Sequence, residues 1–363
     1  MPRDKSLDAL RGLAIVLVVA GHAIPAAVVA SHGGPGWISI DPTSWVPTAT
    51  AKDLLFNLIY SFQMPLFAFV SGLVLWPPRD SPLGKWIALR ARRLLVPYFA
   101  WFLVTYLLIE GSASAGLGGL GAALFGAVVG RGGLWYLYVL FISSVVIESL
   151  ARTRAGRWLV PASVVALAAV VLALPPVNVL YLGQLVAVYP FVVLGYMVSP
   201  FKAKLAEQRR GLLWGAPVVF AVLFYLQYPH WILEMSPIWR IAALVPGGYF
   251  LRILAPYACA AAAIAFLFAL YQKRSGRVTD AQVWLGRRSL GIYAIHGLVL
   301  VLLVRWGLHS ALPLFAISLG ASAALVALLE RVPVLDMVLL GASPRVRPVE
   351  HRTSSEDAPA PGE

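Results

Sequence analysis

The chain has 363 residues, of which 60% are hydrophobic and 12% are charged, and its formal net charge is +13. A soluble globular domain is nearer to half apolar and a quarter charged, so the composition excludes a soluble enzyme and a disordered protein. The single cysteine, Cys259, excludes a disulfide scaffold and is expected to be a small buried apolar residue. Because the apolar runs are continuous rather than alternating, a membrane β-barrel is also disfavoured.

Long apolar runs predict about ten membrane spans, each close to the roughly 20 residues that cross a bilayer as a helix. A spanning segment in lipid must satisfy its own backbone hydrogen bonds, so every span is expected to be helical. The sequence therefore predicts an all-α polytopic membrane protein with about ten transmembrane helices. The predicted spans lie near residues 12–30, 55–76, 94–110, 134–150, 158–174, 179–198, 211–228, 250–271, 290–307 and 312–330.

Basic residues are concentrated in alternate connections between these spans. Of the 29 lysines and arginines, 24 lie before the first span or after the second, fourth, sixth, eighth and tenth. Connections rich in lysine and arginine stay in the cytoplasm, so both termini are predicted to be cytoplasmic. In a soluble protein this charge would suggest a nucleic-acid partner. Here membrane topology explains the charge, and no nucleic-acid partner is expected.

Two further apolar stretches do not fit this count of spans. If residues 112–129 crossed the membrane, every later basic connection would move outside, so this stretch is expected to be re-entrant or interfacial. Residues 238–250 contain a Pro-Gly-Gly break and are expected to form a short or broken helix at the outer face. Residues 1–341 would then be one membrane-embedded domain, and the polar, Pro-rich residues 342–363 a disordered cytoplasmic tail.

The first span carries ionisable residues, which are costly in a membrane and often functional. Separations of three and eleven residues bring Asp8, Arg11 and His22 near one side of a helix. With a rise of about 1.5 Å per residue, His22 lies roughly 16 Å deeper than Arg11, near the middle of the bilayer. Imidazole titrates near neutrality and can accept a proton from an attacking hydroxyl. The spacing therefore predicts a catalytic base at the end of a cavity, with Arg11 at the mouth and Asp8 holding that arginine.

These three residues also have a purely structural interpretation. Asp8 would cap the helix, Arg11 would extend to the membrane surface, and His22 would bond to a neighbouring helix. The basic start and apolar core of this segment are also typical of a signal peptide, although Arg11 and His22 argue against cleavage.

Polar residues also occur in the second and ninth spans. His296 lies about 12 Å along the ninth span, at a depth similar to that of His22, so the two histidines are expected to line one cavity. The alternative for His296 is a hydrogen bond to a backbone carbonyl. Gln63 is a polar residue in an otherwise apolar span, and the nearby Ser71-Gly72 pair permits close helix approach. Helix packing alone is the alternative explanation for this segment.

Arg90 and Arg93 precede the third span. A guanidinium group is suited to binding phosphate, and the alternative role is to anchor the helix at the cytoplasmic surface. The sequence contains no Cys/His metal spacing, phosphate-binding loop or dinucleotide fingerprint, so no metal is expected.

Five segments of the chain, taken together, resemble the acyltransferase 3 family of integral membrane enzymes. The first segment is the most specific, because the family pattern of an arginine, ten residues and a histidine is matched by Arg11 and His22. The resemblance extends over the first nine spans. The segments are SLDALRGLAIVLVVAGH (6–22), SFQMPLFAFVSG (61–72), RARRLLVPY (90–98), LWYL (134–137) and SLGIYAIH (289–296).

This resemblance implies transfer of an acyl group, commonly acetyl, from cytosolic acyl-CoA to an acceptor hydroxyl. Acceptors in the family are often surface polysaccharides, lipid-linked sugars or small secreted products, and the setting is a cell membrane, here a bacterial inner membrane. The resemblance gives His22 the catalytic role and Arg11 the support of that site or of the donor. The matching segments make Arg90 and Arg93 candidate donor-binding residues. Candidate substrate-binding residues are Gln63, Ser71, Trp135, Tyr293 and His296.

Two departures from the family pattern affect the acceptor side. Many members carry a histidine where this chain has Gln63, and many carry another where it has Gly133. The sequence also leaves open whether His22 deprotonates the acceptor directly or carries the acyl group itself. A transporter or flippase of a small polar or lipid-linked substrate is the rival function, but such proteins often have paired halves that are not seen here. A membrane scaffold would leave the polar face of the first span without a purpose.

Overall fold

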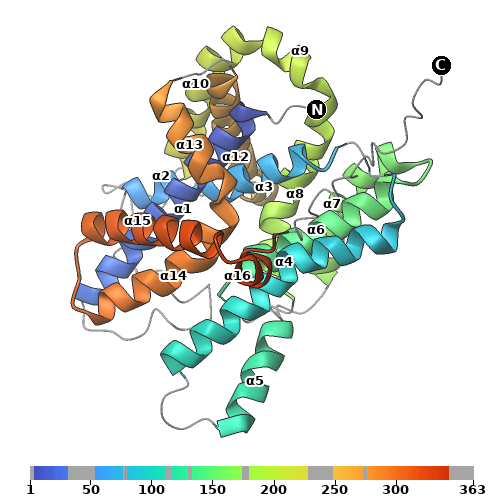
Figure 1. Cartoon of the computed structure of the whole chain (residues 1–363). Helices are drawn as coiled ribbons and strands as arrows, with labels where there is room; N and C mark the ends of the chain where they lie inside the picture. The colour runs from blue at the N-terminus through green and yellow to red at the C-terminus, as the bar shows by residue number, and fades with distance from the viewer. Residues whose placement is uncertain are drawn as a thin grey trace, which may run out of the picture.

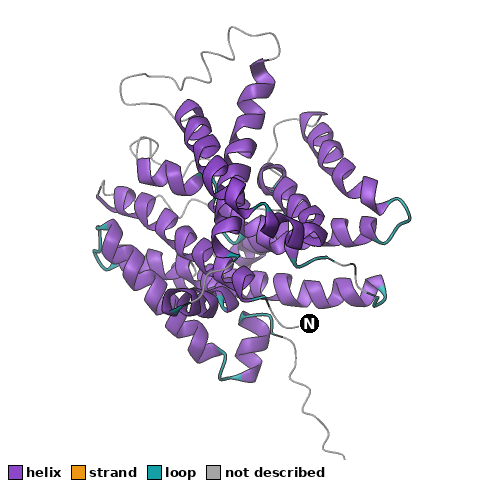
Figure 2. Ribbon diagram, turned by 90° about the horizontal axis from the view of Figure 1, so that it is seen from above, coloured by secondary structure: helices purple, strands orange, loops and turns teal. Residues whose placement is uncertain are grey.

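The computed structural model describes residues 4–31, 54–76, 78, 80–110, 116–129, 133–173, 180–227, 248–272 and 276–342. Within these residues the chain is helical with short turns between helices, and no strand occurs among them (Figure 2). An all-α fold is therefore confirmed for the described part of the chain. The expected tail beyond residue 342, and residues 238–247 of the expected outer-face segment, lie outside the described residues.

The helices follow one another along the chain as shown in Figure 1. A π-helical turn, Tyr106–Glu110, extends α4, and a 3₁₀ turn, Ser199–Phe201, links α8 to α9. The α-helices are α1 (Lys5–Ser31), α2 (Leu54–Tyr60), α3 (Gln63–Leu73), α4 (Leu83–Thr105), α5 (Gly116–Val128), α6 (Trp135–Ala151), α7 (Gly156–Ala173), α8 (Leu182–Val198), α9 (Lys202–Glu207), α10 (Arg209–Gln227), α12 (Gly248–Tyr271), α13 (Arg277–Arg287), α14 (Ser289–Arg305), α15 (Ala311–Leu329) and α16 (Pro333–Leu339).

Helices stand at all ten positions where the sequence predicts a span. By length and composition, 8 of the described helical segments can cross a membrane, and 9 can if the bent pair of α13 and α14 counts as one span. The fourth predicted span is α6, an apolar helix of 17 residues. The additional helix α5 has 13 residues, too short for the roughly 20 that a bilayer requires. A multi-pass membrane protein is thus supported, whereas the orientation of its termini stays a prediction.

Several segments expected to be basic connections are helical instead. α4 begins at Leu83 rather than near residue 94, so Arg90 and Arg93 lie within it. Most of the basic residues after the eighth predicted span likewise lie in or beside α13. Long basic side chains can keep their charged ends in water while their stems lie along apolar surface, so a basic segment at the membrane surface need not be a loop. Arg79, Lys273 and Arg274 lie outside the described residues.

α1 packs against α3, α13, α14 and α15 near the middle of the molecule (Figure 1). Its contact with α13 is very close because glycines remove the side chain at two points. A Cβ atom on Gly12 would overlap the backbone of Gln282, and a Cβ atom on Gly286 would overlap the carbonyl of Asp8. Small residues are what lets two helix backbones approach each other in a membrane. α3 and α8 meet in the same way.

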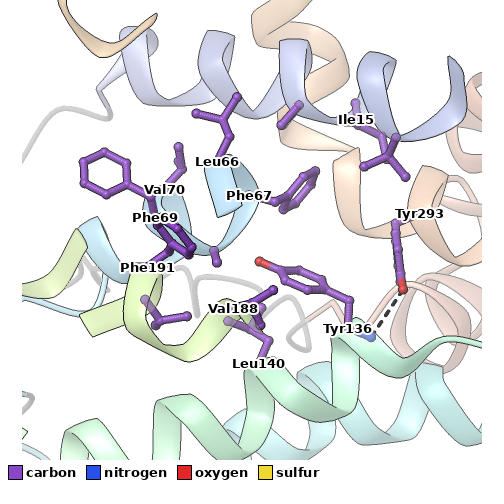
Figure 3. Close-up of a cluster of buried hydrophobic side chains, with 14 of the residues drawn as sticks. Ile15, Leu66, Phe67, Phe69, Val70, Tyr136, Leu140, Val188, Phe191 and Tyr293 are labelled. Atoms are coloured by element: carbon purple, nitrogen blue, oxygen red, sulfur yellow. Dashed lines mark hydrogen bonds between the residues drawn. The ribbon is translucent and has the colours of Figure 1, made fainter. Parts of the chain in front are cut away.

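The apolar core lies around α3 and joins it to its neighbours (Figure 3). Its side chains are buried and interlock between helices, so α3 is held firmly between α1, α6 and α8. The labelled core residues are Ile15 of α1, Leu66, Phe67, Phe69 and Val70 of α3, Tyr136 and Leu140 of α6, Val188 and Phe191 of α8, and Tyr293 of α14.

Two breaks in helices occur next to α1. α2 and α3 are separated by a turn at Ser61 and Phe62, and α13 and α14 are bent by 80° at Arg288. Irregular backbone at membrane depth is tolerated where protein buries it or where it lines a cavity. Both broken segments contact α1, and the candidate site lies between them.

Candidate active site

Asp8 lies between two arginines at the first turns of α1. Its side chain is 2% exposed; Arg11 Nη1 is 3.7 Å from Oδ1, and Arg287 Nε is 3.4 Å from Oδ2. The close contact of Gly286 with the Asp8 backbone brings Arg287 within reach. Arg287 lies in one of the predicted basic connections, the one after the eighth predicted span. Its approach to Asp8 is a tertiary contact that sequence spacing does not reveal.

His22 has its ring held by its own helix. Nδ1 lies 2.7 Å from the carbonyl oxygen of Val18, and because a carbonyl only accepts hydrogen bonds, Nδ1 carries the proton in the neutral ring. Nε2 therefore carries the lone pair. The residue as a whole is partly buried, and its neutral ring has the form that a proton acceptor requires.

His296 of α14 lies against His22. The two ring centroids are 5.1 Å apart in an edge arrangement, as expected for two histidines at one depth. His296 is 4% exposed. Its Nδ1 donates to the carbonyl oxygen of Tyr293 at 2.7 Å, and its own carbonyl accepts a bond from Ser318 at 3.2 Å. The backbone hydrogen bond that was the structural alternative is therefore present together with the contact to His22.

The break between α2 and α3 places two side chains beside His22. The Tyr60 ring centroid is 6.2 Å from that of His22. Gln63, the first residue of α3, is 1% exposed. Its amide lies against Gly21, because a Cβ atom at Gly21 would be 2.7 Å from Gln63 Oε1. Gln63 is therefore next to the residue that precedes His22 on α1.

A line of hydroxyl-bearing side chains leads away from the two histidines. The Tyr293 ring is 5.7 Å from His296, and the Tyr136 ring is 5.7 Å from Tyr293. Figure 3 shows the Tyr293 hydroxyl accepting a bond from the Tyr136 backbone N–H, at 3.3 Å. The Tyr136 hydroxyl is 3.1 Å from Ser71 Oγ. An aromatic residue near the end of a span is typical of the belt at the membrane surface, but Tyr136 is 1% exposed.

The far end of this line carries positive charge. Arg11 and Arg90 both interact electrostatically with the Tyr136 hydroxyl. Arg90 donates from Nε and Nη2 to Ser144 Oγ at 3.2 and 2.9 Å, which fixes its guanidinium group against α6. Arg11 of α1 and Arg90 of α4 are therefore both within electrostatic range of Tyr136.

Other candidate residues lie apart from this line or at its edge. The Arg93 side chain is exposed, and its backbone carbonyl contacts Gly341 after α16. Trp135 is partly buried, with its ring 5.8 Å from that of Tyr136. Gly133 is exposed. An open apolar groove of about 810 Å³ follows α4 and α5, but none of the candidate residues lines it.

The residues that the structure describes include no group of three or more His, Cys, Asp and Glu side chains that could hold a metal ion. Cys259 is buried in α12, as the sequence predicted.

The fold and this site define a multi-pass membrane protein with a histidine pair in its interior and arginines at the end of a polar line. The chain belongs to the acyltransferase 3 family, since that family's model, described as an acyltransferase domain, matches residues 4–331. It is therefore a membrane O-acyltransferase, and the family expected from the five sequence segments is confirmed.

Two curated proteins are similar to the chain, and both are named nodulation protein NolL. The protein from Mesorhizobium japonicum is 24% identical over 378 residues, which cover 94% of this chain and 91% of that protein. The protein from Sinorhizobium fredii is 27% identical over 220 residues, which cover 58% of this chain and 52% of that protein. No solved structure matches the chain.

Proposed function

We propose that this enzyme moves an acetyl group from cytosolic acetyl-CoA to a hydroxyl of a carbohydrate, a lipid-linked sugar or another cell-envelope or secreted acceptor. The enzyme acts within a bacterial inner membrane with both termini in the cytoplasm. Its membrane-embedded domain covers residues 1–341. Membership of the acyltransferase 3 family supports the reaction class, and the alternating basic residues support the orientation.

The observation that carries this proposal is the state of His22. Its Nδ1 proton is directed to Val18, its Nε2 carries the lone pair, and its ring lies against that of His296. His22 is therefore the general base. His296 packs on its edge and, with Gln63, forms the acceptor side of the site.

The donor enters from the arginine end. Arg11 and Arg90 bind phosphate groups of acyl-CoA, for which the guanidinium fork is suited, and the exposed Arg93 adds positive charge at the entrance. Asp8 orients Arg11 by ion pairing. Ser71, Tyr136 and Tyr293 line the way toward the histidines, and Trp135 borders it.

The reaction is a base-assisted acyl transfer. Nε2 of His22 takes the proton of the acceptor hydroxyl as its oxygen attacks the thioester carbonyl carbon. The new C–O bond forms, the C–S bond breaks, and the departing thiolate of CoA takes the proton back from Nε2. The Val18 carbonyl bonds to Nδ1 throughout and stabilises the transient imidazolium.

The test is CoA release from labelled acetyl-CoA by purified protein in lipid nanodiscs. Loss of a general base typically costs ~10²–10⁴-fold in rate, so His22→Ala should lose activity by that factor. His309→Gln, at an exposed histidine, is the matched control and should keep wild-type activity. Near-normal CoA release by folded His22→Ala would refute the proposal.

A further inference from the structure

Gln63 contains a buried polar atom that the proposed chemistry does not use. Its side chain is 1% exposed, and its carbonyl oxygen Oε1 has no hydrogen-bond partner in the described structure. Buried side-chain oxygens in folded proteins are nearly always hydrogen-bonded. An oxygen without a partner, next to a reactive histidine, suggests that the partner is supplied by a bound molecule.

The position of this oxygen is well determined by its surroundings. Gln63 begins α3 directly after the break at Ser61 and Phe62. Its amide lies on Gly21, and only the absence of a side chain there makes room for it. Tyr60 interacts with the same amide and also lies against His22. Oε1 is therefore fixed beside Gly21 of α1, the residue that precedes the general base His22.

The reacting hydroxyl cannot be the partner of Oε1. That hydroxyl has a single proton, which His22 takes during attack, while a carbonyl oxygen accepts hydrogen bonds and donates none. The group that bonds to Oε1 must be a second donor on the same acceptor molecule, such as a neighbouring hydroxyl or an amide N–H. A simple alcohol has no such second donor, whereas the hydroxyl-rich ring of a sugar does.

We propose that Gln63 is a specificity-determining residue whose Oε1 binds a second hydrogen-bond donor of the acceptor, adjacent to the hydroxyl that is acylated. The acceptor therefore carries at least one further donor, a hydroxyl or an amide N–H, next to the hydroxyl that is acylated. This inference rests on the proposed function, because it assumes that acceptor and His22 meet at this place.

The experiment compares two probes that differ by one hydroxyl, trans-1,2-cyclohexanediol and cyclohexanol. Each is supplied as acyl acceptor to the full-length protein in nanodiscs, and ester formation from labelled acetyl-CoA is measured as kcat/KM per hydroxyl, because the diol carries two equivalent hydroxyls. The wild-type enzyme should favour the diol by about tenfold, the effect expected of one neutral hydrogen bond. In Gln63→Met, which lacks the accepting oxygen at similar size, the ratio should fall to about one, and in Gln63→Glu, which keeps such an oxygen, the preference should return.

The diol-to-alcohol ratio is formed within each variant, so a general loss of rate does not change it. The inference is overturned if the wild type uses the two probes equally or uses neither. It is also overturned if the preference for the diol persists in Gln63→Met. The wild-type comparison decides the question even if Gln63→Met does not fold. CoA release by water without added alcohol tests the proposed function separately. If that release depends on His22 but the diol-to-alcohol ratio does not change as expected, the proposed role of Gln63 is refuted and the proposed function is not.

Discussion

Asp8→Asn offers a direct test of how α1 and α13 organise the donor end of the site. The substitution keeps the size of the side chain and removes the charge that lies 3.7 Å from Arg11 and 3.4 Å from Arg287. Both distances exceed those of good hydrogen bonds, so the interaction is mainly coulombic. Two unit charges about 4 Å apart attract by about 4 kcal/mol at an effective dielectric constant of about 20, before desolvation is counted.

The net change in the free energy of unfolding depends on how exposed the three side chains are. Asp8 is 2% exposed, whereas Arg11 is 21% and Arg287 is 47% exposed. Breaking a fully buried pair costs about 3–5 kcal/mol, and an exposed pair contributes about 1 kcal/mol or less. We therefore expect Asp8→Asn to lower the free energy of unfolding by about 2 kcal/mol, between these limits. In the Asp8→Asn/Arg287→Gln double variant the loss should be smaller than the sum, because one contact is shared.

Activity gives the second measurement for this variant. Arg11 would lose its orientation, so the KM for acetyl-CoA should rise about tenfold, equivalent to about 1.4 kcal/mol, with a smaller change in kcat. Thermal unfolding and steady-state kinetics in nanodiscs measure both effects. Asp280→Asn, at an exposed carboxylate on the same helix as Arg287, is the control. If Asp8→Asn matches this control in stability and in KM, Asp8 does not organise the donor end of the site.

Three more substitutions test the rest of the line of residues. Arg90→Lys should raise the KM for acetyl-CoA several-fold in steady-state assays, because lysine cannot reproduce the two donor contacts of the guanidinium group to α6. Tyr136→Phe removes a buried hydroxyl and its bond to α3 and should lower the free energy of unfolding by about 1 kcal/mol, measured by thermal unfolding. Gly21→Ala adds a methyl group 2.7 Å from a buried amide oxygen and should lower stability by about 1–3 kcal/mol while reducing transfer to alcohols more than CoA release to water.

Matched controls make these three outcomes decisive. Arg154→Lys alters an exposed arginine, and Gly215→Ala places a Cβ where nothing lies within 4 Å. If Arg90→Lys equals Arg154→Lys in KM, Arg90 does not bind the donor. Stability of Gly21→Ala equal to that of Gly215→Ala would mean that Gln63 does not rest on α1 as described. An unchanged melting temperature for Tyr136→Phe would show that its hydroxyl contact contributes nothing.

Much of the architecture is predictable because lipid imposes a simple rule on the backbone. Long apolar runs must be helical, and helices occur at all ten predicted places. The ends of helices were less predictable, because composition changes gradually at the membrane surface. α4, for example, starts at Leu83 and includes arginines that were expected in a loop.

Within the candidate site, the arrangement of residues along one helix was predictable, whereas most contacts between helices were not. Helical spacing places Arg11 and His22 near one side of the first helix. Because His22 and His296 lie at similar depths in their spans, their contact could also be expected, and the two rings do lie against each other. The pairing of Asp8 with Arg287 depends on two glycines that allow α13 to approach α1, which one sequence does not show. Tyr136 was missed because an aromatic residue near a span end fits the membrane-surface belt equally well.

If His22 is the general base, acyl-CoA must bring its reactive carbon to the position of the His22 ring. His22→Cys in a Cys259→Ala background places the chain's single cysteine there, and bromoacetyl-CoA serves as the probe, since its bromide is displaced by a thiolate. We expect covalent labelling of His22→Cys, detected by intact-protein mass spectrometry, that acetyl-CoA suppresses and that is absent from His309→Cys in the same background. Labelling of His309→Cys alone, or none at residue 22 under conditions where bromoacetamide reacts there, would contradict this role of His22.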